Sequence, residues 1–165
     1  MNFSIEAHIP SDFNDHARVW IFQSSRLFSM SEAFEIETIL KDHCSGWKSH
    51  GHAVKGYANL FFGQFIVVMA DETEATVGGC STDSLFRIIK QIEALCKVNL
   101  FDRQMLAFLV KDKVELLPLA QIKYAVSNNH ISPTTIYFNN TVGTKKELMN
   151  SWMIPICESW LSARV

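Results

Sequence analysis

The chain has 165 residues, of which 48% are hydrophobic and 19% charged, and its formal net charge is -2 at pH 7. This composition is typical of one ordinary globular domain and excludes a disordered or low-complexity chain. A chain of this length buries about two-thirds of its unfolded surface, so it needs no disulfide or metal to fold. No run of Lys or Arg is longer than the pair Lys145-Lys146. Nucleic-acid-binding domains usually carry clusters of Lys and Arg, so the lack of such a cluster excludes typical nucleic-acid binding.

The expected compartment is the cytoplasm. The longest nearly uncharged stretch, residues 58–70, is too short to cross a bilayer, so no membrane insertion is expected. Glu6, Asp12 and Asp15 lie where a signal peptide needs a basic start and an apolar centre. The four cysteines form no CxxC pair: Cys44, Cys80, Cys96 and Cys157. Their spacing predicts free thiols in a reducing compartment.

The first part of the chain predicts an arm, a strand and a helix. Residues 1–16 are polar and irregular, which indicates a surface arm, and the β-rich run 18–22 predicts a strand. Ser29 and Glu32 have the spacing of a capping box. Apolar residues at helical intervals then extend an amphipathic helix to about residue 45.

The middle of the chain completes a recognisable order of elements. Strands are expected at residues 53–60 and 64–70, joined by a turn around Gly63. The second of these is continuously apolar, as in a central strand. A helix is expected from about 81 to 98, and a fourth strand at 104–110. The order β-α-β-β-α-β predicts an α+β fold, a ferredoxin-like sandwich with two helices on one face of a four-stranded antiparallel sheet.

The remaining residues predict a C-terminal α/β extension. It contains a short strand at 114–117, a small helix opened by Pro118 and a strand at 134–138. A second capping box at Thr144 starts a helix that Pro155 must interrupt. The expected organisation is an N-terminal arm at 1–16, a ferredoxin-like core at 17–110 and an extension packed on the core at 111–165.

Several short motifs resemble those of one family. They are RVWI at 18–21, GCSTD at 79–83, LFDR at 100–103, FNN at 138–140, and Trp152 with Ser159-Trp160 near the end. On these motifs the chain resembles, over nearly its whole length beyond the arm, a family of small uncharacterised bacterial proteins. The chain departs from the family pattern at Thr82, where that pattern has Ile. The family has no established activity or ligand, so the resemblance implies no function.

Some members of that family carry the label "ABC transporter ATPase", which fails a physical test on this chain. Such an ATPase holds phosphates and magnesium with a glycine-rich loop that ends in Lys and Ser or Thr. No glycine of this sequence is followed by Lys, and Gly143-Thr144-Lys145 lacks both the earlier glycine and the final hydroxyl. We therefore reject the label, and we expect no cofactor.

Residues 77–83 form the segment where chemistry is most expected. Its two glycines permit a tight turn, and Ser81 or Thr82 can cap the following helix. Cys80 then lies at a helix N-terminus, which favours an anion or a thiolate. The candidate ligand-binding residues are Gly78, Gly79, Ser81, Thr82 and Asp83. The plainer alternative is a simple helix start with Cys80 buried. The nearby carboxylates also oppose an anion site: Asp71, Glu72, Glu74 and Asp83.

The ferredoxin-like topology predicts which residues lie near Cys80. The loop after the third strand shares an end of the sheet with the loop after the first helix, which places Cys80 beside His50, His52 and His16. A thiol within reach of an imidazole is the minimal activated nucleophile, so the catalytic candidates are Cys80 with His50 or His52 as base. Imidazoles and a thiolate also suit zinc. Solvent-facing histidines in a turn remain the plainer alternative.

At the opposite end of the sheet, Arg26 and the pair Asp102-Arg103 are expected to be neighbours. An ion pair between Arg26 and Asp102, or a local turn cap by Asp102, is favoured over an anion site formed by the two arginines. The sequence contains no paired carboxylates, no Ser-His-Asp spacing and no nucleotide fingerprint.

Three functional hypotheses follow, and they leave open whether the protein is an enzyme. The first is a binding or interaction module with an unknown small ligand or protein partner, or a homodimer through the sheet face that the helices leave open. The second is a small thiol-dependent enzyme with Cys80 as nucleophile and His50 or His52 as base. The third is a metal-binding protein that uses the histidines.

Overall fold

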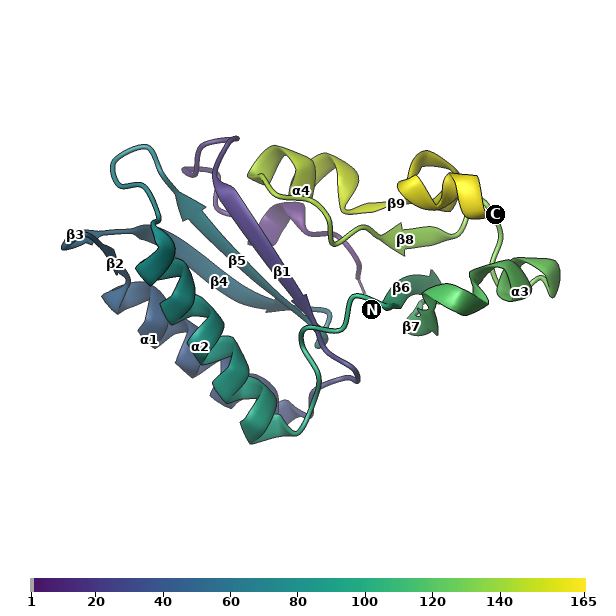
Figure 1. Ribbon diagram of the computed structural model, residues 1–165, viewed down its shortest axis with the longest axis horizontal. Coiled ribbons are helices and arrows are strands. Elements are labelled where there is room, and N and C mark those ends of the chain that lie inside the picture. Colours follow the sequence, from purple (N-terminus) through teal and green to yellow (C-terminus); the bar gives the residue numbers. More distant parts are fainter. Residues whose placement is uncertain (1) are drawn as a thin grey trace.

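The computed structural model describes residues 2–165 and confirms a mixed α+β fold. Its first sheet has three antiparallel strands in the order β1-β5-β4, and helices α1 and α2 lie together on one side of it (Figure 1). The bounds are β1 Arg18–Gln23, α1 Met30–Gly46, β4 Lys55–Phe61, β5 Phe65–Asp71 and α2 Gly79–Cys96.

The central strand β5 explains how this sheet is covered on both faces. Every residue of β5 is buried, as its continuous apolar sequence predicts. Because side chains alternate along a strand, Ile66 and Val68 point into a core with α1 and α2, whereas Phe65 and Val67 point into a second core on the opposite face. Both faces of the first sheet are therefore buried.

The start of α1 confirms the predicted capping box. Ser29 Oγ accepts from the N–H of Glu32 at 3.2 Å, and the Glu32 carboxylate accepts from the N–H of Ser29 at 2.8 Å. At Thr144 only half of the predicted box forms, because the side chain of Glu147 accepts from the N–H of Gly143 instead. Both residues still begin helices, since the hydroxyl satisfies one unpaired N–H in each case.

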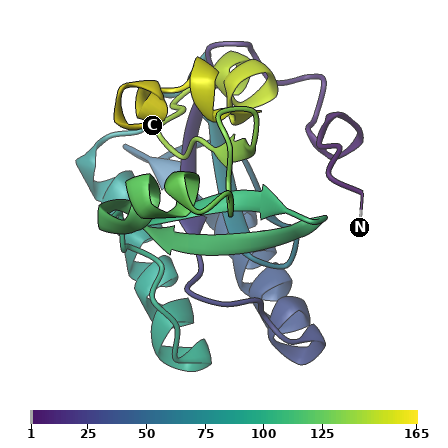
Figure 2. The same ribbon diagram turned by 90° about the vertical axis from the view of Figure 1, so that its right-hand side faces the viewer.

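The ferredoxin-like four-stranded sheet is not confirmed, because the expected fourth strand belongs to a second sheet. That sheet has the order β7-β6-β8-β9, with bounds β6 Met105–Val110, β7 Lys113–Pro118, β8 Ile136–Phe138 and β9 Met153–Pro155. A two-residue turn joins β6 to β7, and Lys111 and Asp112 both have positive φ there, at 49° and 62°. Such a turn matches the twist of a hairpin. The hairpin occupies one edge of β6 and β8 pairs with the other, so neither edge is left for β1. Figure 2 shows the hairpin lying across the front of the view.

The remaining elements are short. They are η1 Glu6–His8, β2 Lys48–Ser49, β3 His52–Ala53, η2 Leu119–Gln121, α3 Ile122–Ser127, α4 Lys145–Ser151, η3 Ile156–Glu158 and η4 Trp160–Arg164. Among residues 2–165, no helix combines the length and the apolar character that crossing a membrane requires.

The N-terminal arm lies on the surface, with most of its residues exposed, but three apolar side chains anchor it to the first sheet. Ile5, Ile9 and Phe13 are buried against the face of the first sheet opposite α1 and α2, and they share that core with Trp152. Burial of each such side chain contributes about 1.5–3 kcal/mol. The arm and the C-terminal residues therefore cover the face that the homodimer hypothesis requires to be open.

Candidate functional site

The diglycine segment and the histidine-bearing turn lie at the same end of the first sheet, where the β2–β3 hairpin contacts the start of α2 (Figure 1). Ser49 Oγ, next to His50, donates to the carbonyl of Thr76 at 2.5 Å and accepts from the N–H of Gly78 at 3.3 Å. The turn itself is tight, because His50 and Gly51 have φ values of 51° and 79°. The hairpin is thus fixed against the loop that leads into α2.

Cys80 and His50 line one hollow of about 390 Å³, named here the Cys80 hollow. Its wall also contains His43 from the last turn of α1, Trp47 directly after that helix, and Ser84 from α2. Both Cys80 and His50 are exposed to solvent. The plainer alternative, a buried Cys80 that only fills space, is therefore wrong.

The first turn of α2 leaves backbone donors free. The helix begins at Gly79 with Gly78 as its N-cap, and no side chain caps it. Within residues 2–165, the N–H groups of Gly79, Cys80 and Ser81 have no hydrogen-bond partner. Unpaired N–H groups at the start of a helix stabilise negative charge. Cys80 is the second residue of the helix and lies among these donors.

Ser81 and Thr82 do not cap α2, which corrects the sequence prediction. The helix starts two residues before Ser81, so both hydroxyls lie inside its first turn and bond to carbonyl groups. Ser81 Oγ donates to the carbonyl of Lys48 at 2.7 Å, and Thr82 Oγ1 donates to that of Gly78 at 3.1 Å. The Ser81 bond attaches the helix to β2, the Thr82 bond stays within the first turn, and both leave the N–H groups of residues 79–81 free.

Gly78 allows the close approach of His50. A Cβ atom on residue 78 would lie 3.2 Å from His50 Nε2, whereas a Cβ on Gly79 would meet no atom within 4 Å. The glycine at 78 therefore has a steric purpose that the glycine at 79 does not share. The imidazole consequently lies against the N-cap of α2.

His43 is a residue of the hollow that sequence reasoning missed. Its ring packs on Trp47 with a centroid distance of 4.9 Å, and its Nε2 is buried without a hydrogen-bond partner in the described residues. Burial lowers the pKa of His43. Trp47 is the C-cap residue of α1, so its ring can contact a side chain of the last helical turn, and this adjacency was the available signal.

The acidic neighbours expected to oppose an anion point elsewhere. Asp71 accepts from the N–H of Asn14 on the other side of the loop, and Glu72 accepts from the N–H of Val77 at 3.1 Å. Neither carboxylate lines the Cys80 hollow, nor does that of Asp83. The charged groups at its wall, within the described residues, are Asp42 and Lys48.

The other two histidines that were predicted to lie beside Cys80, His52 and His16, do not line this hollow. His52 is exposed in β3, and the N–H of His16 donates to the side chain of Asn14. In the portion of the chain that the structure describes, no three His, Cys, Asp or Glu side chains are placed to hold a metal ion. The geometry therefore gives the metal-binding hypothesis no support.

The opposite end of the sheet holds an ion pair with a different partner from the expected one. Arg26 binds both carboxylate oxygens of Glu32 at 2.9 Å and also donates to the carbonyl of Cys96. This bidentate contact is the first cause that lowers the pKa of Glu32 to about 2. Asp102 instead accepts from the N–H of Gln104 at 2.8 Å, so its predicted role as a turn cap is confirmed. The predicted Arg26–Asp102 pair is wrong, and Arg26 is already occupied by a carboxylate.

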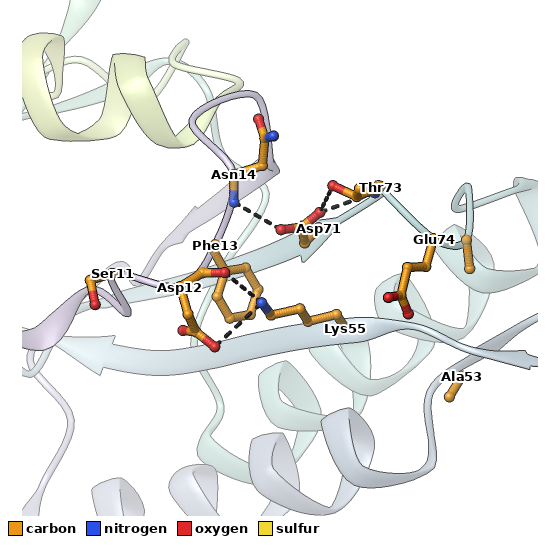
Figure 3. Close-up of a pocket in the computed structure, with 10 residues that line it drawn as sticks. Ser11, Asp12, Phe13, Asn14, Ala53, Lys55, Asp71, Thr73 and Glu74 are labelled. Carbon is orange, nitrogen blue, oxygen red and sulfur yellow. Dashed lines mark hydrogen bonds and ion pairs between the residues drawn. The ribbon is translucent and has the colours of Figure 1, made fainter.

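A second hollow, of about 400 Å³, lies beside the arm (Figure 3) and is named here the arm hollow. The Asp71 carboxylate accepts from the N–H of Asn14 at 2.8 Å and from both the N–H and the hydroxyl of Thr73. Lys55 Nζ contacts the Asp12 carboxylate at 3.3 Å and lies 4.7 Å from the centre of the Phe13 ring. These groups bind one another, so this hollow is where the arm is attached to strands β4 and β5.

All four cysteines are free thiols, as predicted. Burial raises the pKa of Cys44 to about 11 and also raises that of Cys96. The two exposed thiols of the described chain are Cys80 and Cys157. Cys157 belongs to η3 and does not line the Cys80 hollow, so it provides an internal reference.

No protein-family model, no curated protein and no solved structure is significantly similar to this chain.

Proposed function

We propose that the protein is a small thiol-dependent enzyme in which Cys80 is the nucleophile and His50 is the base. The observation that supports this most is that an exposed thiol and an exposed imidazole line one hollow at the uncapped start of α2. A nucleophile, a base and unpaired donors are the three components of an activated thiol site. His52, the other candidate base, does not line the hollow.

The chemistry that fits these groups is acyl transfer to the thiol. His50 takes the proton of Cys80, and the thiolate adds to an acyl carbon to form a carbon–sulfur bond. The leaving group departs with the electron pair of its bond to that carbon and receives the proton from His50. Water then gives a proton to His50 and adds to the acyl carbon, the carbon–sulfur bond breaks, and His50 returns the proton to the thiolate, which releases the acid and restores the thiol.

The start of α2 supplies the electrostatic part of this reaction. During attack, the carbonyl oxygen of the acyl group becomes negative and needs donors that are already in place. The free N–H groups of Gly79, Cys80 and Ser81 can provide them. A cytoplasmic setting belongs to the same proposal, because glutathione there keeps an exposed thiol reduced.

Alkylation by iodoacetamide, followed for each cysteine by mass spectrometry, tests this proposal across pH. At pH 7 we expect Cys80 to react about tenfold faster than Cys157, because only Cys80 shares a hollow with a base, His50, and with unpaired N–H groups. Cys44 and Cys96 serve as slow references, since burial raises their pKa values. Equal rates at Cys80 and Cys157 throughout the pH range would contradict the proposal.

A further inference from the structure

The outer edge of β1, on the side that β5 does not occupy, is closed at both ends and open between them. At one end the N–H of Val19 donates to the carbonyl of Gly143 at 3.0 Å. Just beyond the other end, the N–H of Ser25 donates to the carbonyl of Asn99 at 3.0 Å. The open part of this edge therefore has room for a small molecule but not for an added strand.

Two residues direct free backbone groups outward between these ends. In an antiparallel pair, every second residue directs its N–H and C=O to the same side. Ile21 and Gln23 share this parity with Val19, and within residues 2–165 their backbone N–H and C=O groups have no hydrogen-bond partner. Gln23 is buried, and the great majority of buried backbone groups are paired, with protein or with water. The groups at this edge can therefore bind a molecule that enters beside them.

A hollow of about 140 Å³ lies along this edge, and we name it the edge slot. Ile21, Phe22 and Gln23 all line it, although the side chains of Ile21 and Phe22 point to opposite faces of the sheet. What these three residues share is the backbone of the strand edge. The free N–H and C=O groups therefore border the slot.

The volume of the edge slot matches a single ring. A protein cavity of about 150 Å³ holds one benzene molecule. The slot, at about 140 Å³, is close to that size. The size therefore favours one six-membered ring over a peptide.

The walls of the edge slot favour a flat ring without net charge. Phe101, Tyr137 and Trp160 contribute aromatic side chains, and Trp160 Nε1 donates to the Tyr137 hydroxyl at 3.2 Å, which fixes both rings. Aromatic side chains bind other flat rings by offset stacking or edge contacts. Asp102 and Arg103 place one negative and one positive charge at the wall, so neither sign of ligand charge is favoured.

Side-chain amides hold the edge slot open by bonding to one another. Trp152 Nε1 donates to Asn140 Oδ1 at 2.9 Å, and Asn140 Nδ2 donates to Gln23 Oε1 at 2.9 Å. Gln23 Nε2 then donates to the carbonyl of Met105, the first residue of β6, at 3.0 Å. This chain of hydrogen bonds spans the distance between β1 and the second sheet. The slot is therefore preformed, as small-molecule sites usually are.

We propose that the edge slot binds a neutral six-membered heterocycle that contains a cyclic amide, such as a pyridone or a pyrimidinone. Opposite residues of an antiparallel pair exchange two hydrogen bonds, so the outward N–H and C=O of one residue need an acceptor and a donor side by side. The C=O and N–H of a cyclic amide have this arrangement, and the ring that carries them contacts the aromatic walls. This site is separate from the Cys80 hollow and does not depend on thiol chemistry.

Binding is tested by titrating the full chain with 2-pyridone and following the backbone amides in a two-dimensional nitrogen-15 NMR spectrum. We expect saturable shifts that are largest at Ile21 and Gln23 and weaken with distance from the slot. An absence of saturable shifts at millimolar 2-pyridone would mean that the slot holds only water, and it would overturn the proposal.

Two methylated probes test recognition by the amide edge. N-methyl-2-pyridone lacks the donor and leaves a backbone C=O unpaired, so it is expected to bind about tenfold more weakly than 2-pyridone. The matched control is 5-methyl-2-pyridone, which carries the same added methyl group away from the amide edge and is expected to bind within about twofold of 2-pyridone. Equal affinities of the two methylated probes would refute recognition by the N–H and C=O pair.

Two phenylalanine variants test the aromatic wall. Phe86 and Phe101 are both half-buried and both pack on Phe22, with ring centroids 5.8 and 5.6 Å from it, but only Phe101 lines the edge slot. Phe101→Leu is expected to weaken binding of 2-pyridone about fivefold, and Phe86→Leu to leave it unchanged. Equal affinities of the two variants would refute the placement of the ring in the slot. Unchanged amide signals away from each substitution show that the variant is folded.

Discussion

The Cys80 hollow and the arm hollow have nearly equal volumes, about 390 and 400 Å³, and lie next to the segment that joins β5 to α2. Their polar groups are used in opposite ways. In the arm hollow, Asp71 and Lys55 bind the arm itself. In the Cys80 hollow, the thiol, the His50 imidazole and the first N–H groups of α2 lack partners in the described chain. The two hollows therefore differ in whether their polar groups are already bound, and not in their size.

The largest expected effect comes from removing the carboxylate of the arm hollow. Asp71→Ala deletes the acceptor of two backbone N–H groups and one hydroxyl. Hydrogen bonds to a charged group contribute about 1.5–3 kcal/mol each, and they are not additive. We therefore expect a loss of about 3 kcal/mol in the free energy of unfolding, measured by urea denaturation.

Glu74→Ala is the matched control, because Glu74 lines the same hollow but is exposed. This variant is expected to stay within about 0.5 kcal/mol of the wild type. The released arm should also make Asp71→Ala more sensitive to proteolysis near residues 2–16. Equal stabilities of the two variants would show that the arm is not fastened through Asp71.

A smaller effect is expected from acid. The Thr73 hydroxyl, and next the N–H of Asn14, lower the pKa of Asp71 below its ordinary value of 3.8. The unfolded chain therefore binds this proton more readily than the folded one, and stability rises with pH wherever their protonation differs. The contribution is present above the unfolded pKa and is lost as the pH falls through the lowered value.

The measurement compares unfolding midpoints of the wild type and Asp71→Asn between about pH 6 and pH 3. The comparison cancels the acid response of Glu32, whose pKa is also lowered. We expect the difference in stability to narrow as the pH falls. A constant difference would mean that the charge of Asp71 does not stabilise the fold.

The smallest change tests the packing at the Cys80 hollow. Gly78→Ala places a Cβ 3.2 Å from His50 Nε2, so the imidazole must move, whereas Gly79→Ala meets no atom within 4 Å. We expect Gly78→Ala to slow alkylation of Cys80 several-fold at pH 7, and Gly79→Ala to leave the rate unchanged. Similar rates in both variants would show that the position of His50 does not affect the thiol.

The sequence predicted those parts of the fold that depend on local signals or on one strong strand. Ser29 and Glu32 gave the start of α1, and the apolar run of β5 gave the centre of the first sheet. The fourth strand forms where it was predicted, but it pairs with β7 and β8 and not with β1, and hydrophobic periodicity does not show which partner a strand takes. Topology errors of this kind therefore arise from the choice of partner strand.

The arm and the site show what a closer reading of the sequence offers. Ile5, Ile9 and Phe13 recur every four residues within a polar segment, and that spacing is the signal that the arm is anchored by three buried side chains. That Cys80 and His50 line one hollow was predictable because it depends only on the first three strands, which are arranged as expected. His43 was missed because a single histidine inside an amphipathic helix does not show which hollow it faces.

The most direct measurement compares Cys80 alkylation at pH 7 in two single variants, His50→Gln and His52→Gln. Both histidines are exposed and belong to the same hairpin, but only His50 lines the Cys80 hollow. If His50 is the base, His50→Gln slows Cys80 about tenfold and leaves Cys157 unchanged, while His52→Gln alters neither thiol. Equal Cys80 rates in the two variants and the wild type would contradict a working pair of Cys80 and His50.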